Sequence, residues 1–263
     1  MYKKKFFYSI LFFSIIIGIF SKYLINFFEN YSGINRNYIF IILRFFYFII
    51  LLVVLKNEKI INFRMVSKNF WVIFIFIFFM LFFTIKSTLT EIDHLNLTIS
   101  NFQIGIYLLK NLTVGFFEEF FFRLLIFGYI TMIFKNRNLF FQVIVTSLVF
   151  GFIHFINFFT GETDIYSAFI QFEFAFLAGV FFQILFIRLK NVYLISIIHG
   201  LFNYSSMRDQ LLFKLNDNIP VNYSSIHSFI SSSQTFIILL LLLIPMSYFY
   251  LKKANNELFI QSN

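Results

Sequence analysis

Long apolar runs divided by short polar connectors organise the sequence. Eight of these runs cover approximately residues 6–28, 38–55, 70–86, 102–134, 139–159, 165–187, 191–206 and 229–251. A helix rises about 1.5 Å per residue, so about 20 apolar residues cross the roughly 30 Å hydrocarbon core of a bilayer. The pattern therefore predicts an all-α protein: a polytopic membrane helical bundle of about eight transmembrane helices, with no separate soluble domain.

Two of the eight runs have unusual lengths. The run 102–134 has 33 residues, and we expect it to begin as an amphipathic stretch near the outer interface, where Lys110 can reach water. The run 191–206 is short for a full crossing, so we expect it to be tilted, broken or sheltered by its neighbours.

Composition supports a membrane location and restricts the chemistry. The chain is 60% hydrophobic and 13% charged, whereas soluble domains average about 45–50% apolar and about 25% charged residues. Cysteine is absent, which excludes disulfides, thiolate catalysis and cysteine-bound zinc. Only His, Glu and Asp remain as plausible metal ligands.

The chain has a net charge of +9, and its basic residues are distributed unequally between the two sides of the membrane. Nucleic acid is therefore not an expected partner. If the N-terminus is cytoplasmic, cytoplasmic connectors carry 13 basic residues and opposite connectors carry five, as the positive-inside rule requires. Both termini are then cytoplasmic, and the first apolar run, which has no small-residue cleavage site, is a retained helix. The cytoplasmic set is Lys3, Lys4, Lys5, Lys56, Lys59, Arg64, Lys68, Lys135, Arg137, Arg188, Lys190, Lys252 and Lys253; the opposite set is Lys22, Arg36, Lys86, Arg208 and Lys214.

Six polar side chains lie deep within apolar sequence. A charged residue at the centre of a membrane helix costs roughly 2.5–3.5 kcal/mol on insertion scales, so such residues normally face the bundle interior, pair with one another and serve function. We therefore take these six as the candidate site. They are Glu118, Glu119, Arg123, His154, His199 and Asn203.

Helical spacing indicates which of these side chains can pair and which face other neighbours. Glu119 and Arg123 are four residues apart on one helix face and can form a buried ion pair. Glu118 lies about 100° further around the helix, free to face another neighbour. His199 and Asn203 are also four residues apart and project together.

The cluster suits hydrolysis of a carbonyl compound. A carboxylate and an imidazole facing the same water can accept its proton, and Glu118 and His154 are our candidates for this role. A second imidazole and a carboxamide can donate hydrogen bonds to a carbonyl oxygen that becomes negative, so His199 and Asn203 are candidates for an oxyanion hole.

Three short motifs occur in order: EExxxR at 118–123, FxxxH at 150–154 and HxxxN at 199–203. Together they resemble the CAAX-protease and bacteriocin-processing family of intramembrane peptidases, also called Abi-type or Ras-converting-enzyme-like proteins. The resemblance divides the chain into transmembrane helices 1–3 at 1–101, a catalytic core of helices 4–7 at 102–206, and a loop, last transmembrane helix and cytoplasmic tail at 207–263. Phe150, one of 47 phenylalanines, is best explained by packing.

The resemblance implies an intramembrane endopeptidase, expected in a bacterial cell membrane, that acts on a peptide or membrane-protein substrate. It gives Glu118 and His154 the activation of water, and His199 and Asn203 the oxyanion. The family is often labelled metallopeptidase, so Glu118, His154 and His199 could instead bind zinc. We favour water activation without a metal cofactor.

Other interpretations stay open. Glu119 and Arg123 could be a structural tether that only orients Glu118, and the histidines could be polar contacts between helices. The whole protein could be a non-catalytic membrane partner in bacteriocin immunity or sensor regulation, or, less in keeping with the lack of an inverted repeat, an ion-coupled transporter. Glu173, inside 165–187, matches no motif; it could pair with Arg44 or Lys110, or gate access.

The proposed site raises a question of depth. Glu118 is 17 residues from the cytoplasmic marker Lys135, whereas His199 is only 9 residues from Lys190. On straight helices these positions differ in depth by roughly 12 Å. A shared site therefore requires tilt, a late helix start or a re-entrant segment 191–206.

Overall fold

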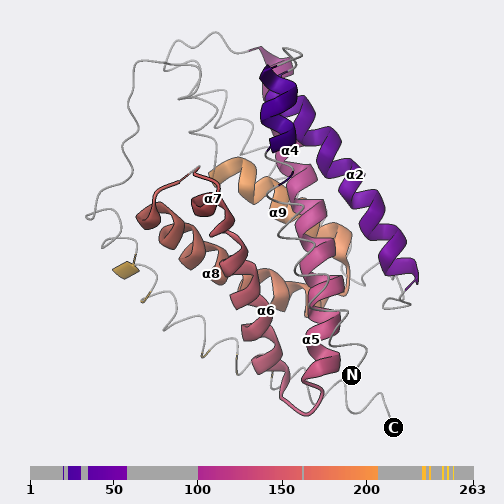
Figure 1. The fold of residues 1–263 in the computed structure, drawn as a ribbon. Helices are drawn as coiled ribbons and strands as arrows, with labels where there is room; N and C mark the ends of the chain where they lie inside the picture. Colours follow the sequence, from indigo (N-terminus) through magenta and orange to yellow (C-terminus); the bar gives the residue numbers. More distant parts are fainter. Residues whose placement is uncertain are drawn as a thin grey trace. The chain divides into compact units, whose positions relative to one another are not determined.

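The computed structural model describes residues 20, 23–30, 35–57, 100–161 and 163–206, together with the single positions 233, 234, 237, 245, 248 and 251. Their regular secondary structure is entirely helical (Figure 1), which confirms the all-α class for this part of the chain. Residues 23–30 are helical, and the labelled helices are α2 (Arg36–Asn57), α4 (Asn101–Glu119), a π-helix (Phe120–Ile126), α5 (Phe127–Ile133), α6 (Leu139–Ile153), α7 (Ile156–Phe159), α8 (Ile165–Leu189) and α9 (Val192–Ser206).

Three stretches within the described residues are long and apolar enough to cross a membrane. They are Arg36–Leu55, Leu139–Phe159 and Ile165–Leu189, and Val192–Ser205 is a shorter apolar helix. These helices support an integral membrane protein. The predicted segment 70–86 lies outside the described residues, as do most of 6–28 and 229–251, so the count of eight crossings and the three-part division of the chain stay predictions.

The chain forms two compact units. One contains residues 23–124 and 190–221, and the other contains residues 1–22, 125–189 and 222–263. The boundary divides the continuous helix α4–π–α5 within its π-helical part. Glu118, Glu119, Arg123, His199 and Asn203 belong to the first unit, whereas His154 belongs to the second.

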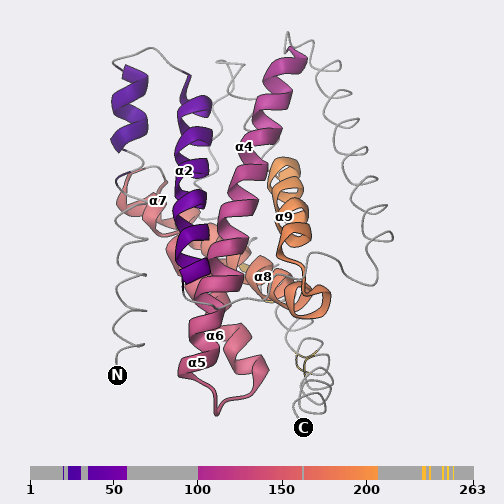
Figure 2. The ribbon, with the colours of Figure 1, turned by 90° about the vertical axis from the view of Figure 1, so that its right-hand side faces the viewer.

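Helix α4 packs between α2 and α9 in the first unit (Figure 2). The α4–α9 crossing is close because glycines meet there: a Cβ atom on Gly115 would lie 2.6 Å from the backbone nitrogen of Gly200, and a Cβ on Gly200 would lie 2.8 Å from Cα of Leu112. Small residues allow membrane helices to approach at backbone distance. On the other side of α4, aromatic rings fill the contact with α2, including Phe48 on Phe120 at 4.9 Å between centroids.

The second unit is built on the contact of α6 with α8. Phe127, Val143, Phe176, Val180 and Leu251 form its buried apolar core. At a second close crossing, a Cβ on Gly179 would lie 3.1 Å from the Phe150 ring and 3.2 Å from Cα of Ser147. This supports the packing interpretation of Phe150 and gives Gly179 the same explanation.

Local sequence explains the helix ends. Ser100 and Gln103 form a capping box at the start of α4, which satisfies backbone N–H groups that lack helical partners. Asn138 and Asn191 cap α6 and α9 by accepting from the amides of Phe141 and Leu194. The predicted segment 139–159 is interrupted by a turn at His154 and Phe155, so α6 ends at Ile153 and the short α7 follows.

Candidate active site

Glu119 and Arg123 form the buried ion pair that their spacing predicts. Nε of Arg123 lies 2.7 Å from Oε2 of Glu119, and Nη2 lies 3.2 Å from Oε1. Both side chains are shielded from solvent, so the two-point contact places donors and acceptors in low dielectric, where such pairs are strong. Glu119 is the last residue of α4 and Arg123 lies in the π-helix; π-helical turns are frequent at functional sites.

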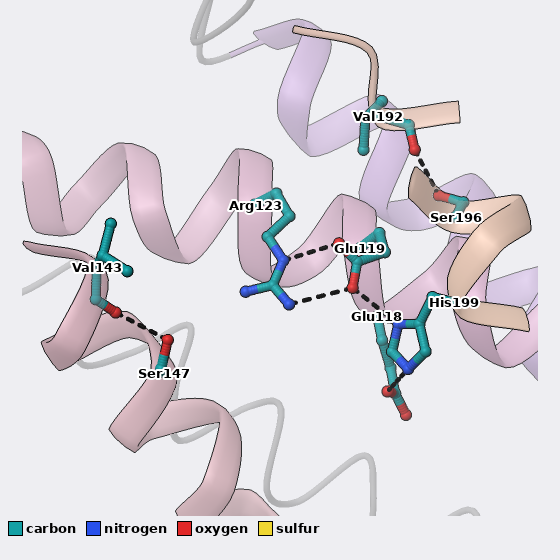
Figure 3. Close-up of polar contacts among 8 residues, drawn as sticks. All are labelled: Glu118, Glu119, Arg123, Val143, Ser147, Val192, Ser196 and His199. Atoms are coloured by element: carbon teal, nitrogen blue, oxygen red, sulfur yellow. Dashed lines mark hydrogen bonds and ion pairs between the residues drawn. The ribbon is translucent and has the colours of Figure 1, made fainter. Parts of the chain in front are cut away.

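His199 of α9 adds a third member to this chain of contacts. Its Nδ1 lies 2.7 Å from Oε1 of Glu119, across the α4–α9 crossing (Figure 3). A carboxylate paired with arginine can only accept hydrogen bonds, so Nδ1 of His199 is the donor. Glu119 thereby fixes both the orientation and the tautomer of the imidazole, as a hydrogen-bonded carboxylate does for a functional histidine.

The other ring nitrogen of His199 faces Glu118. Nε2 lies 3.7 Å from Oε2 of Glu118, and Figure 3 shows the Glu118 side chain beside the imidazole edge. The Glu118 side chain is 17% exposed, compared with 4% for His199 and none for Glu119. Glu118 is therefore the member of the cluster that a water or a substrate group can reach.

Asn203 lies one helical turn after His199 on α9 and is partly buried. Residues four apart share a helix face, so its carboxamide projects on the same side as the imidazole. In the first unit, Glu118, Glu119, Arg123 and His199 are therefore joined by direct contacts. Asn203 lies one helical turn from His199 on the same face of α9.

His154 occupies the C-cap of α6 in the second unit. Its Nδ1 lies 2.9 Å from the backbone oxygen of Phe150, and its ring contacts the Phe150 ring edge to face at 5.2 Å between centroids. Because a carbonyl oxygen only accepts, the proton must be on Nδ1. In a neutral ring this leaves the lone pair of Nε2 available to accept a proton.

A zinc site needs three protein ligands around one point. Among the described residues, no group of three or more His, Asp or Glu side chains is arranged to hold a metal ion. Within the first unit, Glu118 and Nε2 of His199 supply two possible ligand groups. Nδ1 of His199 is already engaged by Glu119. The donor set of this unit is therefore too small for a zinc centre by itself.

The motifs do not predict the hydrogen bond between Glu119 and His199, which lies in the cluster, or the hydrogen bond of Glu173, which lies outside it. The distance in sequence between Glu119 and His199 hides their hydrogen bond, and the spacing of Glu119 predicts only a pair with Arg123 or an orienting role for Glu118. Glu173, the unassigned acid of α8, accepts a hydrogen bond from Oγ of Ser233 at 2.8 Å. Ser233 is the last of three consecutive serines, and nothing in that pattern indicates a partner on α8.

These features define a class first: a helical membrane protein with a buried cluster of carboxylates and imidazole. Residues 100–205 match the model of the type II CAAX prenyl endopeptidase Rce1-like family. The family predicted from the three motifs is thereby confirmed for this part of the chain, which is less than half of its 263 residues. The match includes every candidate site residue and leaves α2 outside. No curated protein and no solved structure matches the chain.

Proposed function

We propose that the protein is an intramembrane endopeptidase that hydrolyses a peptide bond with a water activated by Glu118 and His154. The observation that carries this proposal is the contact chain from Arg123 through Glu119 and His199 to Glu118, inside the segment that matches an endopeptidase family. A purely structural tether would need only the ion pair of Glu119 with Arg123. It would not need an imidazole directed at a second, more accessible carboxylate.

The first chemical step is attack of water on the scissile carbonyl carbon. Glu118 or the free Nε2 of His154 accepts one proton of the water as the new carbon–oxygen bond forms. The carbonyl π electrons move to oxygen, which becomes the oxyanion of a tetrahedral intermediate. Collapse of that intermediate breaks the carbon–nitrogen bond, and the stored proton passes to the leaving amine.

His199 and Asn203 stabilise the oxyanion in this scheme. Because Nδ1 of His199 donates to Glu119, donation to an oxyanion must come from Nε2, and the ring must then carry both protons. Glu119 supplies the counter-charge for that form, while Arg123 supports Glu119. The amide nitrogen of Asn203 is the second donor. A single donor of this kind contributes on the order of 10²–10³-fold in turnover.

The substrate is a peptide or a membrane protein that brings its scissile bond to the membrane-embedded site. The family description refers to prenylated CAAX sequences, so a prenylated C-terminal peptide is one class to test. Unmodified hydrophobic peptides, including bacteriocin-type precursors, are the other. No cofactor is assigned to the reaction.

The direct test is cleavage of a panel of fluorogenic peptides by the purified protein in lipid nanodiscs. The panel contains farnesylated CAAX peptides, the same peptides without the lipid, and hydrophobic precursor peptides. We expect at least one class to be cleaved, and we expect Glu118→Ala and His154→Ala to abolish cleavage in folded protein. Undiminished cleavage by either variant would overturn the assignment.

We also propose a bacterial cell-membrane location with both termini in the cytoplasm, supported by the distribution of basic residues. The native chain contains no cysteine, so a single introduced cysteine labels without background. Lys135→Cys should react with an impermeant maleimide only from the cytoplasmic side, and Asp164→Cys only from the opposite side. The reverse pattern would refute this topology.

A further inference from the structure

Arg44 lies in the middle of α2, inside the apolar span Arg36–Leu55. A charged residue at such a position is expensive in a membrane and is expected to have a specific partner and function. Helix α2 is outside the family match at residues 100–205, so the family resemblance gives Arg44 no role. Its neighbours in the first unit are two aromatic rings and an acid.

Two aromatic rings hold the guanidinium of Arg44. Its Cζ lies 5.0 Å from the centroid of the Phe40 ring and 4.9 Å from that of the Phe117 ring. Both distances are within cation–π range, and such contacts strengthen when the cation is removed from water. Phe40 is one turn earlier on α2, whereas Phe117 belongs to α4. The guanidinium is therefore fixed at the interface between these two helices.

Glu118 follows Phe117 directly in the sequence, and the charge of its carboxylate acts on the Arg44 guanidinium. Aromatic rings fill the contact between α2 and α4 beside these two residues. Phe48 packs on Phe116 and Phe120 at centroid distances of 6.2 and 4.9 Å, and Tyr47 packs on Phe117 at 6.5 Å. Aromatic contacts therefore fix the register of α2 on the turn of α4 that carries Glu118.

We propose that Arg44 is a positioning residue for Glu118, through which α2 contributes to the site from outside the family-matched segment. The charge of Arg44 supports this role as well as its position. Glu118 and Glu119 are adjacent acids in a poorly solvated environment, where charges need compensation. Arg123 compensates Glu119 through a bidentate contact, and Arg44 compensates Glu118. Two acids and two arginines then form a balanced cluster, and the clamped guanidinium keeps the Glu118 carboxylate directed toward His199.

This inference deepens the proposed function, and it rests on that function only for the consequence in turnover. The link between Arg44 and Glu118 is tested without any substrate by a double-mutant cycle on thermal stability in nanodiscs. The variants are R44Q, E118Q and R44Q/E118Q. We expect the fall in unfolding midpoint caused by R44Q to shrink by at least about half in the E118Q background, because the effects of substitutions at interacting charges are non-additive. An equal fall in both backgrounds would overturn the proposal.

Arg36 provides the matched control because it is an arginine of the same helix that pairs with Glu29 at 3.8 Å. The change R36Q should shift the midpoint equally in the wild-type and E118Q backgrounds. Coupling of R36Q to E118Q as large as that of R44Q would show a non-specific effect of charge, and would also overturn the proposal.

Turnover gives the second test, with whichever panel peptide the wild-type protein cleaves. We expect R44Q to lower kcat about tenfold or more with KM unchanged, as for a group that acts on the transition state, and R44K to recover most of the loss. Wild-type kcat in folded R44Q would refute the positioning role. If the wild-type protein cleaves nothing, the proposed function fails, while the stability cycle still decides whether Arg44 is linked to Glu118.

Discussion

Nδ1 of His199 lies 2.7 Å from Oε1 of Glu119, a residue 80 positions earlier in the chain. This hydrogen bond gives Glu119, the second acid of the EExxxR motif, a role beyond its ion pair with Arg123. Glu119 joins two helices and determines which nitrogen of His199 faces Glu118. Glu119 therefore connects the ion pair to the imidazole. Its removal should affect both the stability that depends on the ion pair and the turnover that depends on the imidazole.

Glu119→Gln should damage stability and turnover separately. Loss of the carboxylate leaves the buried Arg123 without its counter-charge, which costs about 3–5 kcal/mol for a buried pair. Combining Glu119→Gln with Arg123→Met should restore much of the unfolding midpoint, because both charges are then absent. Turnover should not recover, since His199 still lacks its carboxylate acceptor.

The control for this prediction is Glu29→Gln, which removes the acid of an ion pair whose side chains are both 42% exposed. Exposed pairs contribute about 0–1 kcal/mol, so its midpoint should stay near that of the wild type. Full recovery of turnover in the Glu119→Gln, Arg123→Met variant would show that Glu119 is only a structural tether.

The glycine crossing should tolerate no added methyl group. Gly115→Ala places a Cβ 2.6 Å from the backbone nitrogen of Gly200, so α4 and α9 must separate and the hydrogen bond of His199 to Glu119 must lengthen. We expect a lower unfolding midpoint and loss of turnover. Gly105→Ala on the same helix meets nothing within 4 Å and should be neutral or stabilising by up to about 1 kcal/mol. Equal behaviour of these two variants would contradict the close crossing.

The sequence predicted those features that depend on local spacing. Helical class, the i,i+4 pair of Glu119 with Arg123, and the placement of His199 and Asn203 on one helix all follow from periodicity. The π-helical turn after Glu119 and the break at His154 did not, because apolar runs look continuous whatever their hydrogen-bond pattern. Residue counting placed Glu118 and His199 roughly 12 Å apart in depth, whereas their side chains approach to 3.7 Å. Counting along straight helices does not include the helix crossing set by Gly115 and Gly200.

The surroundings of Arg44 are a second feature that the sequence does not predict. Its position within an apolar run marks it as unusual, and the sequence pattern suggests it only as a partner of Glu173. Its environment, two aromatic rings and the Glu118 carboxylate, depends on which face of α2 meets α4. In a run so rich in phenylalanine, the hydrophobic pattern does not identify that face.

The N-terminus of α8 should be sensitive to pH. Asp164 accepts hydrogen bonds from the amides of Tyr166 and Ser167 and from the Ser167 hydroxyl, and the bonds with Ser167 hold the pKa of this exposed carboxyl below its usual value. A lowered pKa means that the stabilisation is complete above the unfolded value of about 3.9 and is lost as pH falls through the folded value. The protection of the amides in the first turn of α8 against hydrogen exchange, relative to the intrinsic rate at each pH, should therefore decrease at low pH.

Asp164→Ala should produce fast exchange in that turn at every pH, because the capping acceptor is absent. Serine at this position, which can cap without a carboxylate, should give protection that does not change with pH in the acid range. The same acid-induced loss in Asp164→Ala as in the wild type would exclude Asp164 as its source.

Chelation distinguishes the two proposed roles for the imidazoles. If Glu118 and His154 activate water without a metal, turnover should be unchanged after prolonged dialysis against a strong zinc chelator and should not rise when zinc is added. The measurement is turnover together with metal content determined on the same sample. Loss of turnover with the metal, and recovery on adding zinc back, would favour Glu118, His154 and His199 as ligands instead.

The central claim is that Glu118 activates the water that cleaves a peptide in the membrane. Its most direct test is substrate capture with Glu118→Gln, which preserves the shape of the side chain but cannot accept the proton. Incubated in native membranes and purified, this variant should retain an intact peptide or protein that the wild-type protein cleaves, identified by mass spectrometry with its scissile bond unbroken. Retention of cleaved product by Glu118→Gln, or cleavage of the captured molecule at the wild-type rate, would contradict the account.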